Sequence, residues 1–158
     1  MNLETLKQVL SPLTRWGQDE HQFDVEGTSV TLRPLLPDEE LECQRYAMRI
    51  LQEALSEEGL SEDDKISRMA QMKYFDEYRV VVISFSIVQI GDSDLRNEKF
   101  VETGEKTESG AKVKIPLQVA LRDLISKSWS RGMITITFSK YGDLVTKIAE
   151  KADRIAKE

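Results

Sequence analysis

The chain has 158 residues, of which 40% are hydrophobic and 32% charged, and its formal net charge is −6. This composition is typical of a globular chain and excludes the disordered and collagen-like classes. With one Cys and one His the chain forms no internal disulfide, and we expect no zinc or iron centre, which needs three or four clustered ligands. The longest apolar-rich stretch, Val80–Ile90, is about half a bilayer crossing, so we expect no membrane insertion.

Residues 1–20 are predicted to form a short amphipathic helix or an unanchored arm. Ser11-Pro12 is expected to end this helix. Its leucines follow helical spacing, at Leu3, Leu6 and Leu10. The first residues also lack the apolar run of a signal peptide, so we expect none.

Residues 21–34 alternate apolar and polar on both sides of Glu26-Gly27-Thr28, which predicts a β-hairpin. A two-stranded ribbon is marginal by itself. The hairpin is therefore expected to pack on the helices that follow or to pair with another chain.

Residues 37–90 are predicted to form a pair of helices. The first begins at Pro37 and the acids that follow it, because proline suits a first turn and carboxylates complement the helix dipole. Glycine favours its end at Glu58-Gly59. Its apolar stripe comprises Leu41, Ala47, Met48, Leu51, Ala54 and Leu55.

Ser61 and Asp64 resemble a capping box for the second helix, which we expect from Glu62 onward. Its apolar face comprises Met69, Met72, Phe75, Tyr78, Val82 and Phe85. This period favours a helix to about Gln89. The β-branched run Val80–Ile83 has high strand propensity, so residues 80–90 fit either a helix or a strand.

Residues 99–116 are predicted to form a second hairpin, with a polar loop at 104–111. Pro116 then opens a helix over 117–130 with apolar surface for two contact faces. The last helix of the 117–157 segment repeats apolar residues at steps of four and three, a heptad pattern typical of lengthwise packing. These residues are Ile134, Phe138, Tyr141, Val145, Ile148, Ala152 and Ile155.

The prediction for the whole chain is an α+β, mainly helical single domain of about five helices, two short β-hairpins and a long C-terminal helix.

No local motif supports catalysis. Gly104 and Gly110 are separated by five residues where a Walker loop has four, and a strand-like segment follows them instead of a helix. His21 and Cys43 lie far apart in sequence, and neither has the partner that nucleophilic catalysis needs. We therefore expect no enzyme and no cofactor.

Charge is concentrated in one region. Residues 38–64 contain ten acids and two arginines, a local charge of −8. An acidic face disfavours nucleic-acid binding and suits a basic protein partner. Trp129 is either a core residue or an interface anchor.

Four short segments, taken in order, resemble a known group of proteins. They are Val30–Leu36 in the first hairpin, the acidic helix start Asp38–Glu42, Leu121–Arg131, and Lys140–Leu144 on the last helix. The chain resembles the small tail-assembly proteins of tailed bacteriophages, and more narrowly the tail-assembly chaperones and baseplate-hub assembly proteins of long-tailed phages. The resemblance covers roughly residues 20 to 150.

The resemblance implies a non-enzymatic protein that contacts tape-measure or baseplate-hub subunits, in the host cytoplasm during assembly or in the tail or baseplate of the virion. Because chaperones of this group are mostly helical and this chain carries hairpins, a structural baseplate or tail-completion component is an alternative. Our interface candidates are Arg33, Trp129, Phe138, Tyr141, Val145 and Ile148.

Two further classes stay open. One is a small regulatory interaction module that forms a homo-oligomer through its C-terminal helix. The other is a small enzyme or ligand-binding domain, which would need polar groups that converge from distant parts of the chain.

Overall fold

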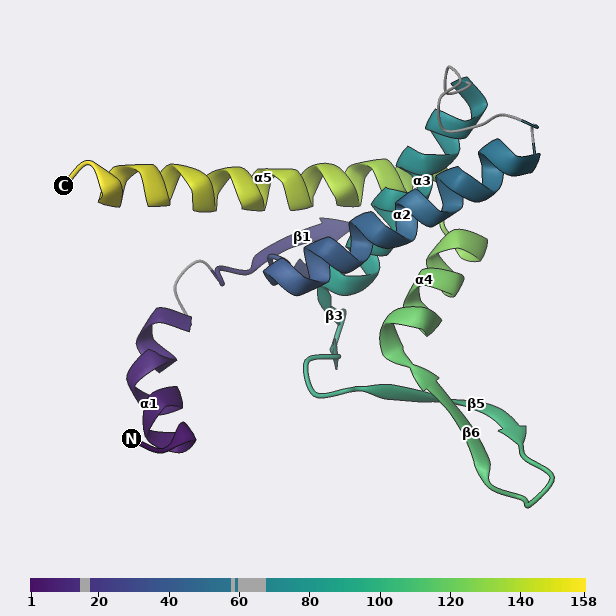
Figure 1. Cartoon of the computed structure of the whole chain (residues 1–158), viewed down its shortest axis with the longest axis horizontal. Helices are drawn as coiled ribbons and strands as arrows, with labels where there is room; N and C mark the ends of the chain where they lie inside the picture. The colour runs from purple at the N-terminus through teal and green to yellow at the C-terminus, as the bar shows by residue number, and fades with distance from the viewer. Residues whose placement is uncertain (15–17, 58, 60–67) are drawn as a thin grey trace.

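Helices and short strands alternate along the chain in a computed structural model that describes residues 1–14, 18–57, 59 and 68–158 (Figure 1). The helices in this part of the chain are α1 (Leu3–Thr14), α2 (Pro37–Glu57), α3 (Arg68–Ser86), α4 (Leu117–Ser128) and α5 (Arg131–Ala156). The strands are β1 (His21–Val25), β2 (Thr28–Leu32), β3 (Ile87–Ile90), β4 (Ser93–Asp94), β5 (Phe100–Lys106) and β6 (Lys112–Pro116). The predicted α+β class with a long C-terminal helix is confirmed.

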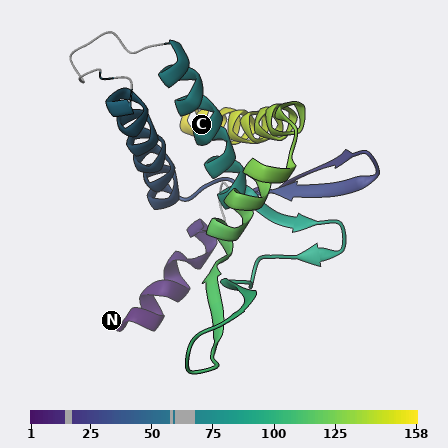
Figure 2. The same ribbon diagram turned by 90° about the vertical axis from the view of Figure 1, so that its right-hand side faces the viewer.

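Helix α3 is central, because α2, α4 and α5 all contact it (Figure 2). It carries the β-branched run Val80–Ile83, which is buried and helical. The helix ends at Ser86, whose Oγ donates to the carbonyl oxygen of Ile83 at 3.1 Å. The prediction of a helix to about Gln89 is wrong for residues 87–89, which form β3 together with Ile90, so the strand alternative holds for the last part of residues 80–90.

The first hairpin belongs to a larger sheet. Strands β1 to β4 form an antiparallel sheet in the order β1-β2-β3-β4. Glu26 and Gly27 both have positive φ, at 49° and 82°, as a tight hairpin turn requires. Leu32 on β2 lies opposite Ile87 on β3, and both are buried. Backbone pairing with β2 therefore ends the helical period of α3.

The second hairpin is confirmed as the separate two-stranded sheet β5-β6. Strand β5 extends to Lys106, into the predicted loop, and each of its residues is exposed. The hairpin projects from the start of α4, away from the helices (Figure 1).

Helix α2 begins at Pro37 as predicted, but its apolar stripe is narrower than expected. Leu41 and Met48 are exposed, and the buried residues are Cys43, Ala47, Leu51, Ala54 and Leu55. Gly59 has the positive φ of a glycine that follows a helix, at 70°, and Glu58 lies outside the described residues. The predicted capping box, the helix start at Glu62 and the side chain of Met69 also lie outside them.

Two other helices differ from expectation. Helix α1 continues through Ser11-Pro12 to Thr14, because a proline removes a single backbone hydrogen bond and does not always end a helix. On α4 the predicted second contact face is open, since Val119 and Leu124 are exposed. Met72 and Phe75 on α3 are exposed as well.

Candidate functional site

The predicted interface seam on α5 is mostly part of the core. Phe138, Tyr141 and Ile148 pack against a cluster of buried residues from the sheet, α3 and α4. Val145 is 42% exposed, whereas its neighbour Leu144 is 2% exposed. The face of α5 that packs on the core, which we call its contact line, is therefore rotated relative to the face that the heptad pattern predicts. Thr137 and Leu144 are buried on this face, and the heptad pattern did not include them.

Aromatic rings join α5 to α3. The ring centroids of Tyr78 and Phe138 are 6.1 Å apart at 71°, an edge-to-face contact. Phe138 and Tyr141 follow at 6.3 Å. Burial raises the pKa of Tyr141 to about 12, and its hydroxyl accepts from the Leu35 N–H at 3.5 Å. These partly buried residues join the two helices.

Arg33 is also occupied within the chain. It donates to both carboxylate oxygens of Glu39, at 2.8 and 2.7 Å. Arg33, an interface candidate, thus forms an ion pair with the acidic start of α2.

Trp129 lies directly after α4, where it is half-buried against the main core cluster. It also lines a cleft of about 230 Å³ between α3, α4 and the start of α5. The Arg131–Asp76 ion pair, at 2.6 Å, lines the same cleft. Trp129 therefore has a packing role and one accessible side.

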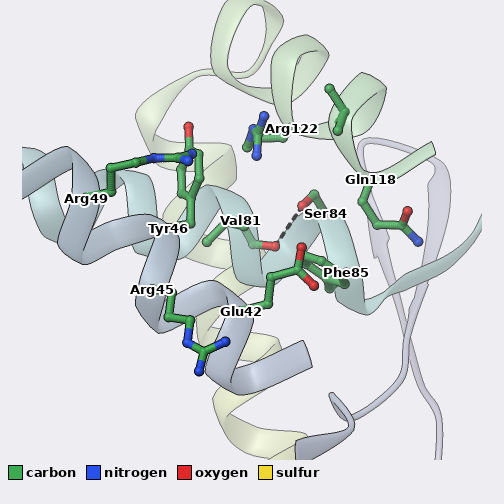
Figure 3. Close-up of a pocket in the computed structure, with 10 residues that line it drawn as sticks. Glu42, Arg45, Tyr46, Arg49, Val81, Ser84, Phe85, Gln118 and Arg122 are labelled. Atoms are coloured by element: carbon green, nitrogen blue, oxygen red, sulfur yellow. Dashed lines mark hydrogen bonds between the residues drawn. The ribbon is translucent and has the colours of Figure 1, made fainter. Parts of the chain in front are cut away.

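A cleft that sequence reasoning missed lies between α2, α3 and α4 (Figure 3). Its volume is about 220 Å³. Val81, Ser84 and Phe85 of α3 form its floor, and the Ser84 Oγ donates to the Val81 carbonyl at 2.7 Å. The walls are lined by Glu42, Arg45, Tyr46 and Arg49 of α2 and by Gln118, Val119 and Arg122 of α4.

Two arginines from facing helices meet at the ring of Tyr46. The guanidinium carbon of Arg122 is 4.3 Å from the ring centroid, and that of Arg49 is 5.3 Å from it. Both distances are within cation–π range. Burial raises the pKa of Tyr46, and the nearby charge of Arg122 opposes the rise. The phenol is therefore neutral at physiological pH and acts as a stacking surface.

The three arginines that line the cleft have no carboxylate partner in the described part of the chain. Of the ion pairs within 4.0 Å there, none includes Arg45, Arg49 or Arg122. We call the surface formed by Tyr46, Arg49, Arg122, Phe85 and Val119 the arginine cleft. A second cavity of about 320 Å³ adjoins it and shares Tyr46, Val119 and Arg122.

In the described residues, no group of three or more His, Cys, Asp and Glu side chains is placed to hold a metal ion. None of the described helices is long and apolar enough to cross a membrane. No protein-family model, no curated protein and no solved structure matches the chain.

Proposed function

We propose that the chain is a non-enzymatic interaction protein of phage tail assembly that contacts a tape-measure or baseplate-hub subunit. The short segments that resemble phage tail-assembly proteins support the biological setting. The exposed apolar side chains of α1 support protein–protein contact as the mode of action.

The observation that carries this proposal is the exposure of the apolar side chains of α1. Leu3, Leu6 and Leu10 are 66%, 42% and 42% exposed on a helix of 12 residues. The helix lies apart from the main body of the fold (Figure 1). Isolated helices shorter than about 12 to 15 residues are marginal in water, so α1 needs a covering surface to be stable. An amphipathic helix in a groove of a partner meets this need.

The test is complex formation with the tape-measure and hub subunits of the source phage, followed by size exclusion with light scattering. Changing Leu3, Leu6 and Leu10 to Asp is expected to abolish the complex. The matched control changes Glu4 and Lys7, an exposed ion pair on the same helix, to Gln and is expected to retain it. Both variants should keep the thermal midpoint of the wild type. A complex that survives the leucine changes would contradict this mode of action.

A structural component retained in the virion is the second candidate, and the β5-β6 hairpin favours it. Its strands pair only with each other among the described residues, so each has an edge open to strand addition. Mass spectrometry of assembled particles distinguishes the two candidates. A chain present in stoichiometric amounts supports the structural component, and a chain absent from particles supports the chaperone.

A further inference from the structure

We propose that the arginine cleft binds a short acidic and apolar peptide segment of a protein partner. This inference rests on the proposal that the chain acts by protein–protein contact, and it names the chemistry of one contacting segment. A carboxylate of the segment lies between the guanidinium groups of Arg49 and Arg122, and a neighbouring apolar side chain lies on Phe85 and Val119.

The charge argument starts from the two cations. Arg49 and Arg122 approach the same aromatic ring from different helices, and neither has a carboxylate within 4.0 Å in the described part of the chain. Like charges held together favour an anion between them. Stacking on Tyr46 limits the conformations of both side chains, so less entropy is lost when they bind.

The rest of the cleft decides which anion fits. Glu42 lines it, and Glu77 and Asp123 line the adjoining cavity. Asp123 is paired with Lys127 at 2.9 Å, but the other two carboxylates repel a continuous chain of phosphates. The apolar surface of the cleft comes from the partly exposed ring of Phe85 and from Val119 on the α4 wall, which is 37% exposed. An isolated carboxylate next to an apolar side chain matches this surface, and a nucleic-acid backbone does not.

The residue types agree with recognition of protein. Arginine and tyrosine are enriched among the residues that dominate binding energy at protein interfaces. Acidic motifs are commonly recognised by arginine clusters, because the planar guanidinium donates two parallel hydrogen bonds to a carboxylate.

The test uses the full-length chain and a short fluorescein-labelled peptide in which a single glutamate is flanked by leucines, read by fluorescence anisotropy. A peptide with glutamine in place of glutamate is the ligand control. We expect saturable binding of the acidic peptide that weakens as salt is added, and weaker binding of the glutamine peptide.

Arg49→Gln with Arg122→Gln is expected to weaken binding by about tenfold or more. Lys147→Gln with Arg154→Gln is the matched control, since it removes the same total charge from exposed positions on α5 that line neither cavity. Its effect should stay below about threefold. Arg49→Lys with Arg122→Lys keeps the charge but loses the planar donors, and it should also weaken binding.

Three results would overturn the inference. They are no binding of the acidic peptide, an equal loss of peptide affinity in the α5 control variant and the arginine double variant, and displacement of the peptide by inorganic phosphate or a single-stranded oligonucleotide at equal concentration. If the glutamine double variant does not fold, the wild type decides. Peptide-induced shifts of the Arg49 and Arg122 side-chain NMR signals support the inference, and unshifted signals reject it.

No tail protein is needed for this test. If the wild-type chain does not bind the peptide but its complex with the tail subunit still requires α1, only the inference about the arginine cleft is rejected. If the peptide binds but the tail complex does not depend on α1, the proposed role of α1 is rejected and the inference about the arginine cleft stands.

Discussion

The Arg33 guanidinium donates two parallel hydrogen bonds to the Glu39 carboxylate, from Nη1 to Oε2 at 2.8 Å and from Nη2 to Oε1 at 2.7 Å. Glu39 Oε2 also accepts from the Leu36 N–H at 2.8 Å. The two side chains are 28% and 19% exposed. Together these contacts fix the angle at which α2 leaves the end of β2.

Glu39→Gln is expected to lower the free energy of unfolding by about 1–3 kcal/mol, because the charge-assisted hydrogen bonds are lost and the Arg33 charge stays half-buried. The measurement is urea unfolding at neutral pH. Glu40→Gln is the matched control, since Glu40 is the exposed neighbour on the same turn, and its effect should be below about 0.5 kcal/mol. Equal losses in the two variants would show that the ion pair does not stabilise the fold.

The contribution of Glu39 should depend on pH. Burial by itself would raise the pKa of Glu39, but hydrogen bonds from Arg33 and Leu36 and the charge of Arg33 outweigh it and hold the pKa below its ordinary value of 4.5. A lowered folded-state pKa means stability that is present above pH 4.5 and lost as the pH falls through the folded-state value. The difference in unfolding free energy between the wild type and Glu39→Gln should therefore be constant near neutral pH and shrink below pH 4.5. A difference that persists unchanged under acid would contradict this assignment.

Cys43 should be unreactive in the folded chain. Burial, followed by the charges of Glu42, Glu39 and Glu40, raises the pKa of its thiol to about 12. The side chain is 0% exposed, and only the thiolate attacks a disulfide reagent. We expect no labelling by an aromatic disulfide at pH 8 without denaturant, and one thiol per chain after unfolding. Rapid labelling of the folded chain would show that α2 separates readily from α3.

Tyr141 and Val145 separate core from surface on α5. Tyr141→Asp places a charge among Phe138, Leu35 and the core of α3, and should cost several kcal/mol, about 3 or more. Val145→Asp changes a side chain that is 42% exposed and should cost less than about 1 kcal/mol. Thermal unfolding followed by circular dichroism measures both. If the Val145 variant loses more unfolding free energy than the Tyr141 variant, Val145 is buried as the heptad pattern predicts.

The start of α2, the β5-β6 hairpin and the length of α5 were predictable because their signals are local. Pro37 and the acids after it favour a first helical turn, and polar residues with glycines separate the two strand-like runs of the hairpin. These features depend on residues that are neighbours in the sequence.

The end of α3 and the contact line of α5 were decided by tertiary structure. The apolar period through Phe85 predicts a helix to about Gln89, but residues 87–90 pair with β2, where the buried backbone groups find partners in another strand. On α5, Leu144 and Val145 are adjacent and both apolar. Only the surface that α5 meets decides which of them is buried.

The arginine cleft is another feature that the sequence determines only in part. The sequence by itself determined that Tyr46 and Arg49 share α2 at a spacing that makes them helical neighbours. Arg122 comes from α4, and it reaches the same ring only because α2 and α4 both pack on α3. Local propensities set the helices, but the position of one helix relative to another depends on the burial of apolar surface between distant segments, which is where this site is made.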